Sequence, residues 1–319
     1  MVTVSRRCAA ALVALVVSAT LVGCDPAVPV PVLAVTGTGS GADAVPGDGV
    51  CEVTPGAGDC TLNAAVDEGN ALGRATIILS AGTYDTPNLH VTGDLAIVGD
   101  VNTVQLANQE VRVAPGGRLS ISGVHSAYIT GVHFVVEGTL IVDHASLVVI
   151  ESVWPAIDVR PGGRAVVNDS LMAQVFMFST PAVRNAGTLV LRHSVVYAFD
   201  TDPNALVLVN EGTTTSAASV ITGCSGTPPE SLGYNASPGG TCAWTGPGDV
   251  VDADLGTTIE LSSPFHYTLT ATSDLVDAIP VGVAGCGTGT DLLGRERPVD
   301  GDGDGVAACD IGAIERPAG

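Results

Sequence analysis

Short runs in which apolar and polar residues alternate recur along the middle of the chain, and each run follows a glycine. These glycines are Gly93, Gly117, Gly138, Gly163, Gly187 and Gly212, with separations of 24, 21, 25, 24 and 25 residues. Residues two and four places after each glycine, such as Leu119 and Ile121, are mainly apolar, while their neighbours are mainly polar. Alternation with a period of two predicts β-strands with one buried face.

The nearly constant period predicts that these strands stack as a solenoid. Each repeat has room for about three short strands of ~5 residues, and equivalent side chains of stacked coils would lie ~4.8 Å apart. Seven places after the glycines the residues are mostly small, as expected at a tight corner: Val124, Ala145, Ser170, Ser194 and Ser219. The pattern therefore predicts an all-β, single-stranded parallel β-helix whose open ends need caps.

Both ends of the repeat region contain segments that could serve as caps. Residues 60–73 predict a short amphipathic helix that ends at Gly73. Its apolar side would carry Leu62, Ala65, Val66 and Ala71, with Asp67 and Glu68 elsewhere. Residues 76–84 are expected to form the first strand and turn, within a cap and first coil over 51–92. The β-helix is expected over 93–285, with a Gly/Pro-rich loop at 223–248, and an acidic segment over 286–319 ends the chain.

The beginning of the chain predicts export. Residues 1–23 combine Arg6 and Arg7 with an apolar stretch too short for a comfortable membrane span, which is typical of a secretory signal peptide. The stretch ends in Leu-Val-Gly-Cys24, which resembles a bacterial lipobox, in which the cysteine is lipidated and becomes the mature N-terminus. An ordinary cleavage site beside an incidental cysteine is the alternative. Residues 24–50 then predict a lipidated, flexible tether to a membrane of the bacterial cell envelope.

Six cysteines remain when Cys8 and Cys24 are set aside, and six thiols allow 15 pairings. An even count in an exported chain favours disulfides. Pairing of sequence neighbours is the simplest scheme, joining Cys51 to Cys60, Cys224 to Cys242 and Cys286 to Cys309. The absence of a CxxC pair or a close Cys/His cluster argues against a zinc site.

The charge balance excludes one class of partner. Without Arg6 and Arg7, ten arginines and no lysine stand against 33 acidic residues, a side-chain balance of −23. A surface with this balance repels nucleic acid and attracts divalent cations. We therefore expect no nucleic-acid partner.

The two ends of the chain resemble known families. Residues 42–84 resemble the CSLREA domain of exported bacterial β-helix proteins, through Cys60, Thr61, Leu62, Asn70, Thr76, Ile77, Gly82, Thr83 and Tyr84. Asn63 and Gly69 depart from that pattern, which usually has arginine and alanine there. The tail resembles the closing segment of "choice-of-anchor Q" proteins, through Asp277, Asp291, Gly294, Arg297, Pro298, Asp310, Ile311, Gly312, Ala313 and Glu315. The resemblance implies a right-handed parallel β-helix at the cell surface and no established activity.

The tail also contains a pattern typical of calcium loops. Asp300, Asp302 and Asp304 alternate with glycines, a spacing that lets carboxylates converge on one ion. Ile311 stands where an EF-hand loop would have a bidentate glutamate, so that Asp310 or Glu315 would have to complete the site. The sequence predicts calcium at Asp300, Asp302, Asp304 and Asp310, and no other cofactor. A polar, glycine-rich turn is the alternative.

One column of the repeat carries potentially catalytic groups. Six places after the glycines lie His144, Asp169 and His193, which stacked coils would bring into a ladder. Such a ladder could act in acid–base chemistry or contact a carbohydrate. Alternatively, these residues are corner residues that bond local backbone groups, as Asn, Asp and His commonly do.

Enzymatic function has weaker support in the sequence. A polysaccharide lyase or hydrolase could draw on Asp143, Asp158, Asp169, Arg160, Arg164 and Arg192, but no motif ties these residues together. GxSxG, P-loop and HExxH motifs do not occur. The sequence thus predicts a non-catalytic surface lipoprotein that presents a β-helix for structural or adhesive contacts with glycan, matrix or protein. The alternatives are a polysaccharide-active enzyme, with a lyase favoured over a hydrolase, and a calcium-stabilised spacer.

Overall fold

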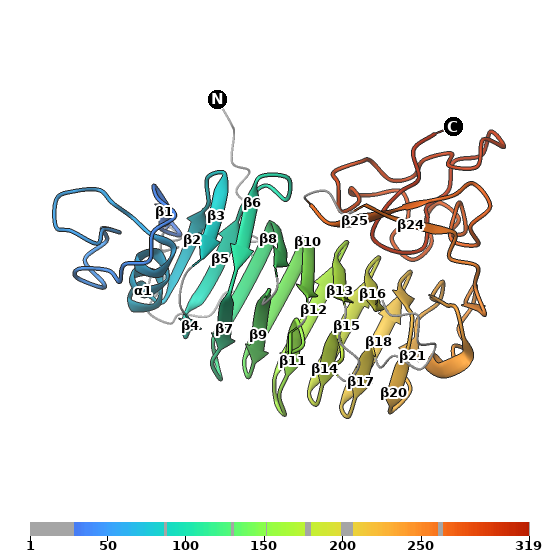
Figure 1. Ribbon diagram of the computed structural model, residues 1–319, viewed down its shortest axis with the longest axis horizontal. Helices are drawn as coiled ribbons and strands as arrows, with labels where there is room; N and C mark the ends of the chain where they lie inside the picture. The colour runs from blue at the N-terminus through green and yellow to red at the C-terminus, as the bar shows by residue number, and fades with distance from the viewer. Residues whose placement is uncertain are drawn as a thin grey trace, which may run out of the picture.

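The computed structural model describes residues 29–85, 88–128, 131–150, 152–175, 180–198, 207–260 and 264–318. The described chain forms a parallel β-helix that begins beside one helix, and its C-terminal part folds back over one side of the coils (Figure 1). The predicted fold is confirmed. The predicted signal peptide at 1–23 and the lipid site at Cys24 lie outside the described residues.

Each coil contributes strands to three faces, and every strand pair within these faces is parallel. Face 1 consists of β2 (Arg74–Ile78), β5 (Asp94–Val98), the first halves of β8 (Arg118–Tyr128) and β10 (Thr139–Ile150), β12 (Arg164–Asn168), β15 (Thr188–Arg192), β18 (Thr213–Ala217) and β21 (Glu230–Ser231). Face 2 consists of β3 (Gly82–Asp85), β6 (Val104–Ala107), the second halves of β8 and β10, β13 (Leu171–Val175), β16 (Val195–Ala198), β19 (Val220–Ile221), β22 (Ala236–Ser237) and β23 (Val250–Val251). Face 3 consists of β4 (Leu89–Val91), β7 (Gln109–Val113), β9 (Val132–Val136), β11 (Ile157–Val159), β14 (Val183–Asn185), β17 (Leu208–Asn210) and β20 (Cys224–Gly226).

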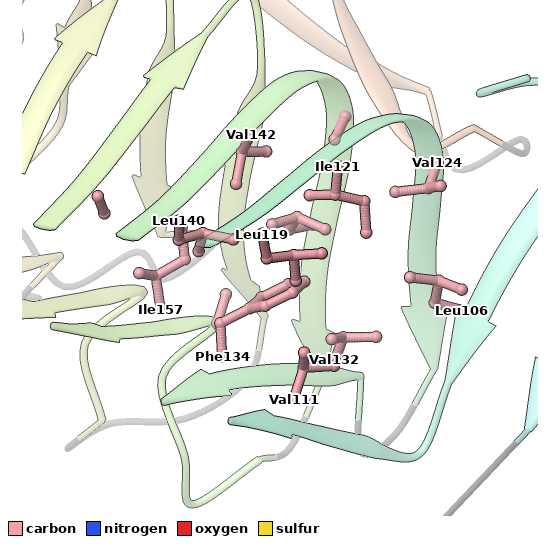
Figure 2. Close-up of a cluster of buried hydrophobic side chains, with 14 of the residues drawn as sticks. Leu106, Val111, Leu119, Ile121, Val124, Val132, Phe134, Leu140, Val142 and Ile157 are labelled. Carbon is pink, nitrogen blue, oxygen red and sulfur yellow. The ribbon is translucent and has the colours of Figure 1, made fainter. Parts of the chain in front are cut away.

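The predicted columns stack in register. Leu119 pairs with Leu140, which pairs with Ala165, and the column continues through Leu189 to Thr214. These side chains are buried. Leu119 and Leu140 lie in the interior beside Phe134 of face 3 (Figure 2). The alternation seen in the sequence is therefore the alternation between core and outer surface.

The six regularly spaced glycines, here called the marker glycines, are required because there is no room for a side chain at their positions. A Cβ on Gly138 would lie 2.3 Å from the carbonyl oxygens of Ala114 and Gly117, and a Cβ on Gly187 would lie 2.3 Å from the oxygen of Gly163. Each marker glycine therefore sits where the backbone of one coil touches the backbone of the coil before it. No side chain fits in that gap, which explains why the period is visible as glycine.

The N-terminal helix is confirmed, but its buried side is not the predicted one. Helix α1 (Leu62–Leu72) begins at Thr61, whose Oγ1 accepts the Ala64 N–H at 3.1 Å, and ends at Gly73 in the left-handed conformation. Ala71 is exposed, whereas Glu68 is fully buried. The Glu68 carboxylate accepts hydrogen bonds from the backbone N–H groups of Gly47 and Gly49, so its charge is satisfied by the preceding loop rather than by water.

The tether predicted over 24–50 is wrong for residues 32–50. Strand β1 (Val32–Ala34) pairs with β2 and buries Leu33, and Val35 is buried directly after it. A free edge of the first coil offers unpaired N–H and C=O groups, and this short strand covers it. The first strand of the described residues is therefore β1. The segment 76–84, which was predicted to form the first strand and turn, contributes to β2 and β3 instead.

The far end of the solenoid is closed by the Gly/Pro-rich loop. The disulfide between Cys224 and Cys242 holds this loop, and Cys242 and Trp244 are buried in the same core as the coils. The two other disulfides join Cys51 to Cys60 and Cys286 to Cys309. All three neighbour pairings are thus confirmed. None of the helices in the described residues has the length and apolarity to cross a bilayer.

The solenoid ends earlier than predicted, because coil pairing stops at β23 rather than continuing to residue 285. Residues 253–318, here called the C-terminal cover, contain the antiparallel pair β24 (Thr257–Glu260) and β25 (His266–Leu269). The C-terminal cover lies against the outside of face 2 (Figure 1). Leu171 and Val195 point outward there and form a second core with residues of the cover such as Tyr267 and Ile311.

Candidate functional site

The column with His144, Asp169 and His193 lies at the corner between faces 1 and 2. All of its members have positive φ: 64° at Gly123, 48° at His144, 43° at Asp169, 43° at His193 and 52° at Ala218. The chain turns sharply there, in a conformation that costs most side chains energy but that Asn, Asp and His adopt more readily. These residues therefore stand at a corner of the coil, which is the position that the alternative interpretation expected.

The serines one place later satisfy the backbone at this corner. Ser170 Oγ accepts the N–H of Ala145 in the previous coil at 3.0 Å and donates to the Asn168 carbonyl at 2.6 Å. Ser194 and Ser219 repeat this arrangement in the next two coils. Buried N–H groups must find partners, so the small residues of this column are structural.

The side chains of the corner column contact the C-terminal cover instead of local backbone. His144 Nε2 lies 2.9 Å from Thr290 Oγ1, and His193 Nε2 donates to the Ala284 carbonyl at 2.8 Å. Asp169 Oδ1 lies 3.3 Å from a guanidinium nitrogen of Arg297. His193 is only 7% exposed. The three residues are brought together, as predicted, but beneath the cover.

Arg297 is the centre of a buried polar network that the sequence did not reveal. Its side chain is 2% exposed and pairs with Glu315, which is fully buried. It also donates to the Gly312 carbonyl at 2.9 Å. The Glu315 carboxylate accepts the Asp310 N–H at 3.1 Å, while the Glu315 N–H donates to Asp291 at 2.9 Å. The residues that carry the tail resemblance therefore fold the tail and fasten it to the corner.

Burial and the charge of Arg297 together set the pKa values of the groups in this network. Burial raises the pKa of Asp169 to about 6 and that of Glu315 to about 8, although Arg297 opposes both shifts. Burial lowers the pKa of His193 to about 4, and Arg297 adds to this effect. The hydrogen bond to Asp143 raises the pKa of His144. Shifts of this kind occur in catalytic sites and in structural ion-pair networks alike, and here the groups already bind one another.

The six charged residues considered for a lyase or hydrolase are not brought into one cluster. Asp158 lies on β11 in face 3, where its Oδ2 pairs with Arg160 at 2.9 Å. Asp143 and Arg192 lie on face 1 with Asn168 between them in register. Arg164 begins β12 on the same face. Asp169 is paired with Arg297 in the cover.

The aspartates that converge in the acidic tail are not the same set as the sequence pattern predicted. Asp277, Asp300 and Asp302 each offer a carboxylate oxygen, and these oxygens lie within 4.8 Å of one another. Asp304 instead accepts the N–H of Val306 at 2.7 Å. Asp310 accepts the N–H groups of Asp277 and Arg316. The carboxylates that converge are thus those of Asp277, Asp300 and Asp302, and those of Asp304 and Asp310 lie outside this group. Asp277 lies far upstream and was not among the predicted ligands, and calcium binding stays a prediction.

Set against protein-family models, curated proteins and solved structures, the chain matches none of them. The resemblance of its two ends to the CSLREA domain and to the choice-of-anchor Q tail therefore stays a prediction.

Proposed function

We propose that this protein is a non-catalytic lipoprotein of the bacterial cell envelope, which presents its β-helix for structural or adhesive contacts. The signal-like segment 1–23 and the lipobox-like cysteine at 24 support export and a membrane anchor. The three disulfides support a destination outside the reducing cytosol. A rigid stack of coils suits the presentation of an extended surface.

One observation carries the non-catalytic part of this proposal. The column predicted to carry acid–base groups, with His144, Asp169 and His193, lies beneath the C-terminal cover, and the side chains of these three residues bind that cover. A substrate would have to displace Arg297 and the Ala284 carbonyl to reach these groups. The corner column therefore serves stability in this proposal.

The test is a search for cleavage. Residues 25–319, made with disulfides intact, would be incubated with acidic and neutral polysaccharides, in calcium or in chelator. We expect neither unsaturated products nor new reducing ends with any of them. Calcium-dependent cleavage that is lost in Asp169→Asn would contradict the proposal and favour the polysaccharide lyase.

A calcium-stabilised spacer is the second candidate, because the carboxylates of Asp277, Asp300 and Asp302 converge. Hard oxygen ligands in an acidic protein suit calcium. Calcium at ~100 times its Kd should raise the free energy of unfolding by about 2–3 kcal/mol, measured as a higher Tm. Asp302→Asn should abolish this gain, whereas Asp304→Asn should retain it. An unchanged Tm in calcium, or equal losses in both variants, would refute this site.

A further inference from the structure

A groove crosses the corner between faces 3 and 1. Unlike the corner between faces 1 and 2, which lies beneath the C-terminal cover, this corner is open to solvent. Its volume is about 1110 Å³, and Arg112, Arg118, Glu137 and Arg160 line it together with the glycine-rich turns of three successive coils. The sequence shows these turns only as glycine-containing breaks between strands, so it does not reveal that their arginines line one groove.

The register of the strands creates the groove. Val113, Val136 and Val159 are stacked, and so are Arg118, Thr139 and Arg164. The turns that join these two rows span residues 114–117, 137–138 and 160–163. A short turn thus lies between two longer ones, and the longer ones project as walls. At the wall tips Gly116 and Gly162 have φ of 82° and 84°, with open space where a Cβ would point.

Arginine side chains are concentrated at this groove, although the protein as a whole is strongly acidic. Three of the ten arginines that follow Arg7 line it, and their side chains are 43%, 48% and 43% exposed at Arg112, Arg118 and Arg160. Because the flanking coils are two steps apart, the arginines of the two walls repeat at ~10 Å along the axis. Each of these arginines is paired with a carboxylate, so what the groove offers an anionic ligand is guanidinium N–H donors rather than a net positive field.

Existing ion pairs orient these guanidinium groups and leave donors for a ligand. Arg112 contacts Glu137 at 2.9 Å, Arg118 uses Nε toward Asp94 at 3.4 Å, and Arg160 uses one terminal nitrogen toward Asp158. A guanidinium has five N–H donors in a planar fork that matches a carboxylate or a sulfate.

An aromatic platform lies at the other edge of face 3, in the turn that precedes β11. Trp154 is 57% exposed and stacks on His133, with ring centroids 5.6 Å apart and planes at 28°. His133 is held at Nδ1 by the Pro155 carbonyl at 2.6 Å. His133 pairs in register with Glu110, which contacts Arg112 at 3.6 Å. A flat ring that is fixed from behind and open in front suits stacking on the apolar face of a sugar.

We propose that the groove and Trp154 together bind an acidic polysaccharide, whose carboxylate or sulfate groups contact Arg112, Arg118 and Arg160 while a sugar ring stacks on Trp154. This inference deepens the proposed adhesive function and rests on it. The open groove lets a long chain pass across the coils, so that the site suits a polymer more than a single small anion.

Binding of polygalacturonate, heparin and neutral dextran to the purified protein would be measured by calorimetry at low and high salt. We expect binding of an acidic polymer, weaker at high salt, and no binding of dextran. Arg112→Gln with Arg160→Gln should weaken binding roughly tenfold or more, since each loses a charge-assisted hydrogen bond. Trp154→Ala should weaken binding as well. Glu137→Gln should strengthen it, because it removes the acid that competes for Arg112.

Arg192→Gln is the matched control, since Arg192 is an exposed arginine of face 1 outside the groove. It should bind like the wild type, and circular dichroism should show that every variant is folded. Arg160→Gln leaves the buried Asp158 carboxylate without its cation, so this change should lower the Tm. Absence of binding to both acidic polymers, or an equal loss in Arg192→Gln, would overturn the proposal, as would preferential binding to anionic lipid vesicles. Cleavage of a bound polymer would refute the non-catalytic function and leave this site standing.

Discussion

Replacing Gly187 with alanine is expected to destabilise the protein by about 1–3 kcal/mol or more, because an inserted group that forces the backbone to shift in a packed interior typically costs that much. The new Cβ would lie 2.3 Å from the Gly163 oxygen and 2.6 Å from the Arg160 oxygen. Neither backbone atom can move without breaking the register of β12 and β15, which pair directly after these turns. Chemical denaturation followed by circular dichroism measures the loss.

Gly37→Ala is the control for this experiment. Gly37 has no atom within 4 Å of an ideal Cβ and no positive φ, so that this variant should unfold like the wild type. A Gly187→Ala protein as stable as Gly37→Ala would show that the coils can separate at the marker glycines, contrary to the packing described above.

Replacing Arg297 with methionine should release the C-terminal cover and cost about 3–5 kcal/mol, as expected when one partner of a buried ion pair is removed. The change leaves Glu315 and Asp169 without their cation. Burial raises the pKa of Glu315 to about 8 in the folded protein, so the folded state favours the protonated acid. The stability that this group contributes is fully present below its unfolded pKa of 4.5 and is lost as the pH rises to about 8. Arg297 lowers the pKa of Glu315, so that removal of Arg297 extends this loss above pH 8.

The loss in Arg297→Met should therefore be larger at pH 9 than at pH 6, and hydrogen exchange should rise across residues 264–318 before the coils unfold. Arg184→Met is the control, because Arg184 is exposed on β14 and its loss should change little. Equal stability of the two variants, or unchanged exchange in the cover, would argue against the network as the fastening of the tail.

The solenoid could be predicted because its causes are local and repeated. The contact between coil backbones admits only glycine, and burial of one strand face requires alternation of apolar and polar residues. A glycine such as Gly187 and a buried apolar residue such as Leu189 therefore recur together from coil to coil, and this recurrence predicts the fold. The neighbour disulfides and the helix end at Gly73 follow from equally short-range geometry.

The C-terminal cover could not be predicted in this way. Its contacts join residues that are far apart in sequence, such as Asp169 and Arg297. The outward apolar residues of β13, including Leu171, look like an ordinary buried strand until the segment that covers them is placed. The same limit applies to strand β1, which contains Leu33. Its sequence resembles a tether, but it pairs with the free edge of the first coil. It applies also to Asp277, which lies beside Asp300 although it is distant in sequence.

Histidine modification by diethylpyrocarbonate, read by mass spectrometry at pH 7, tests most directly whether the corner column is a fastening rather than an open site. Burial lowers the pKa of His193 to about 4, so its imidazole is neutral and reactive at that pH unless the cover shields it. We expect exposed His90 to react quickly and His193 to resist, and His193 to become reactive in Arg297→Met. Reaction of His193 at the rate of His90 in the wild-type protein would contradict the account, because it would mean that the column lies open to a substrate.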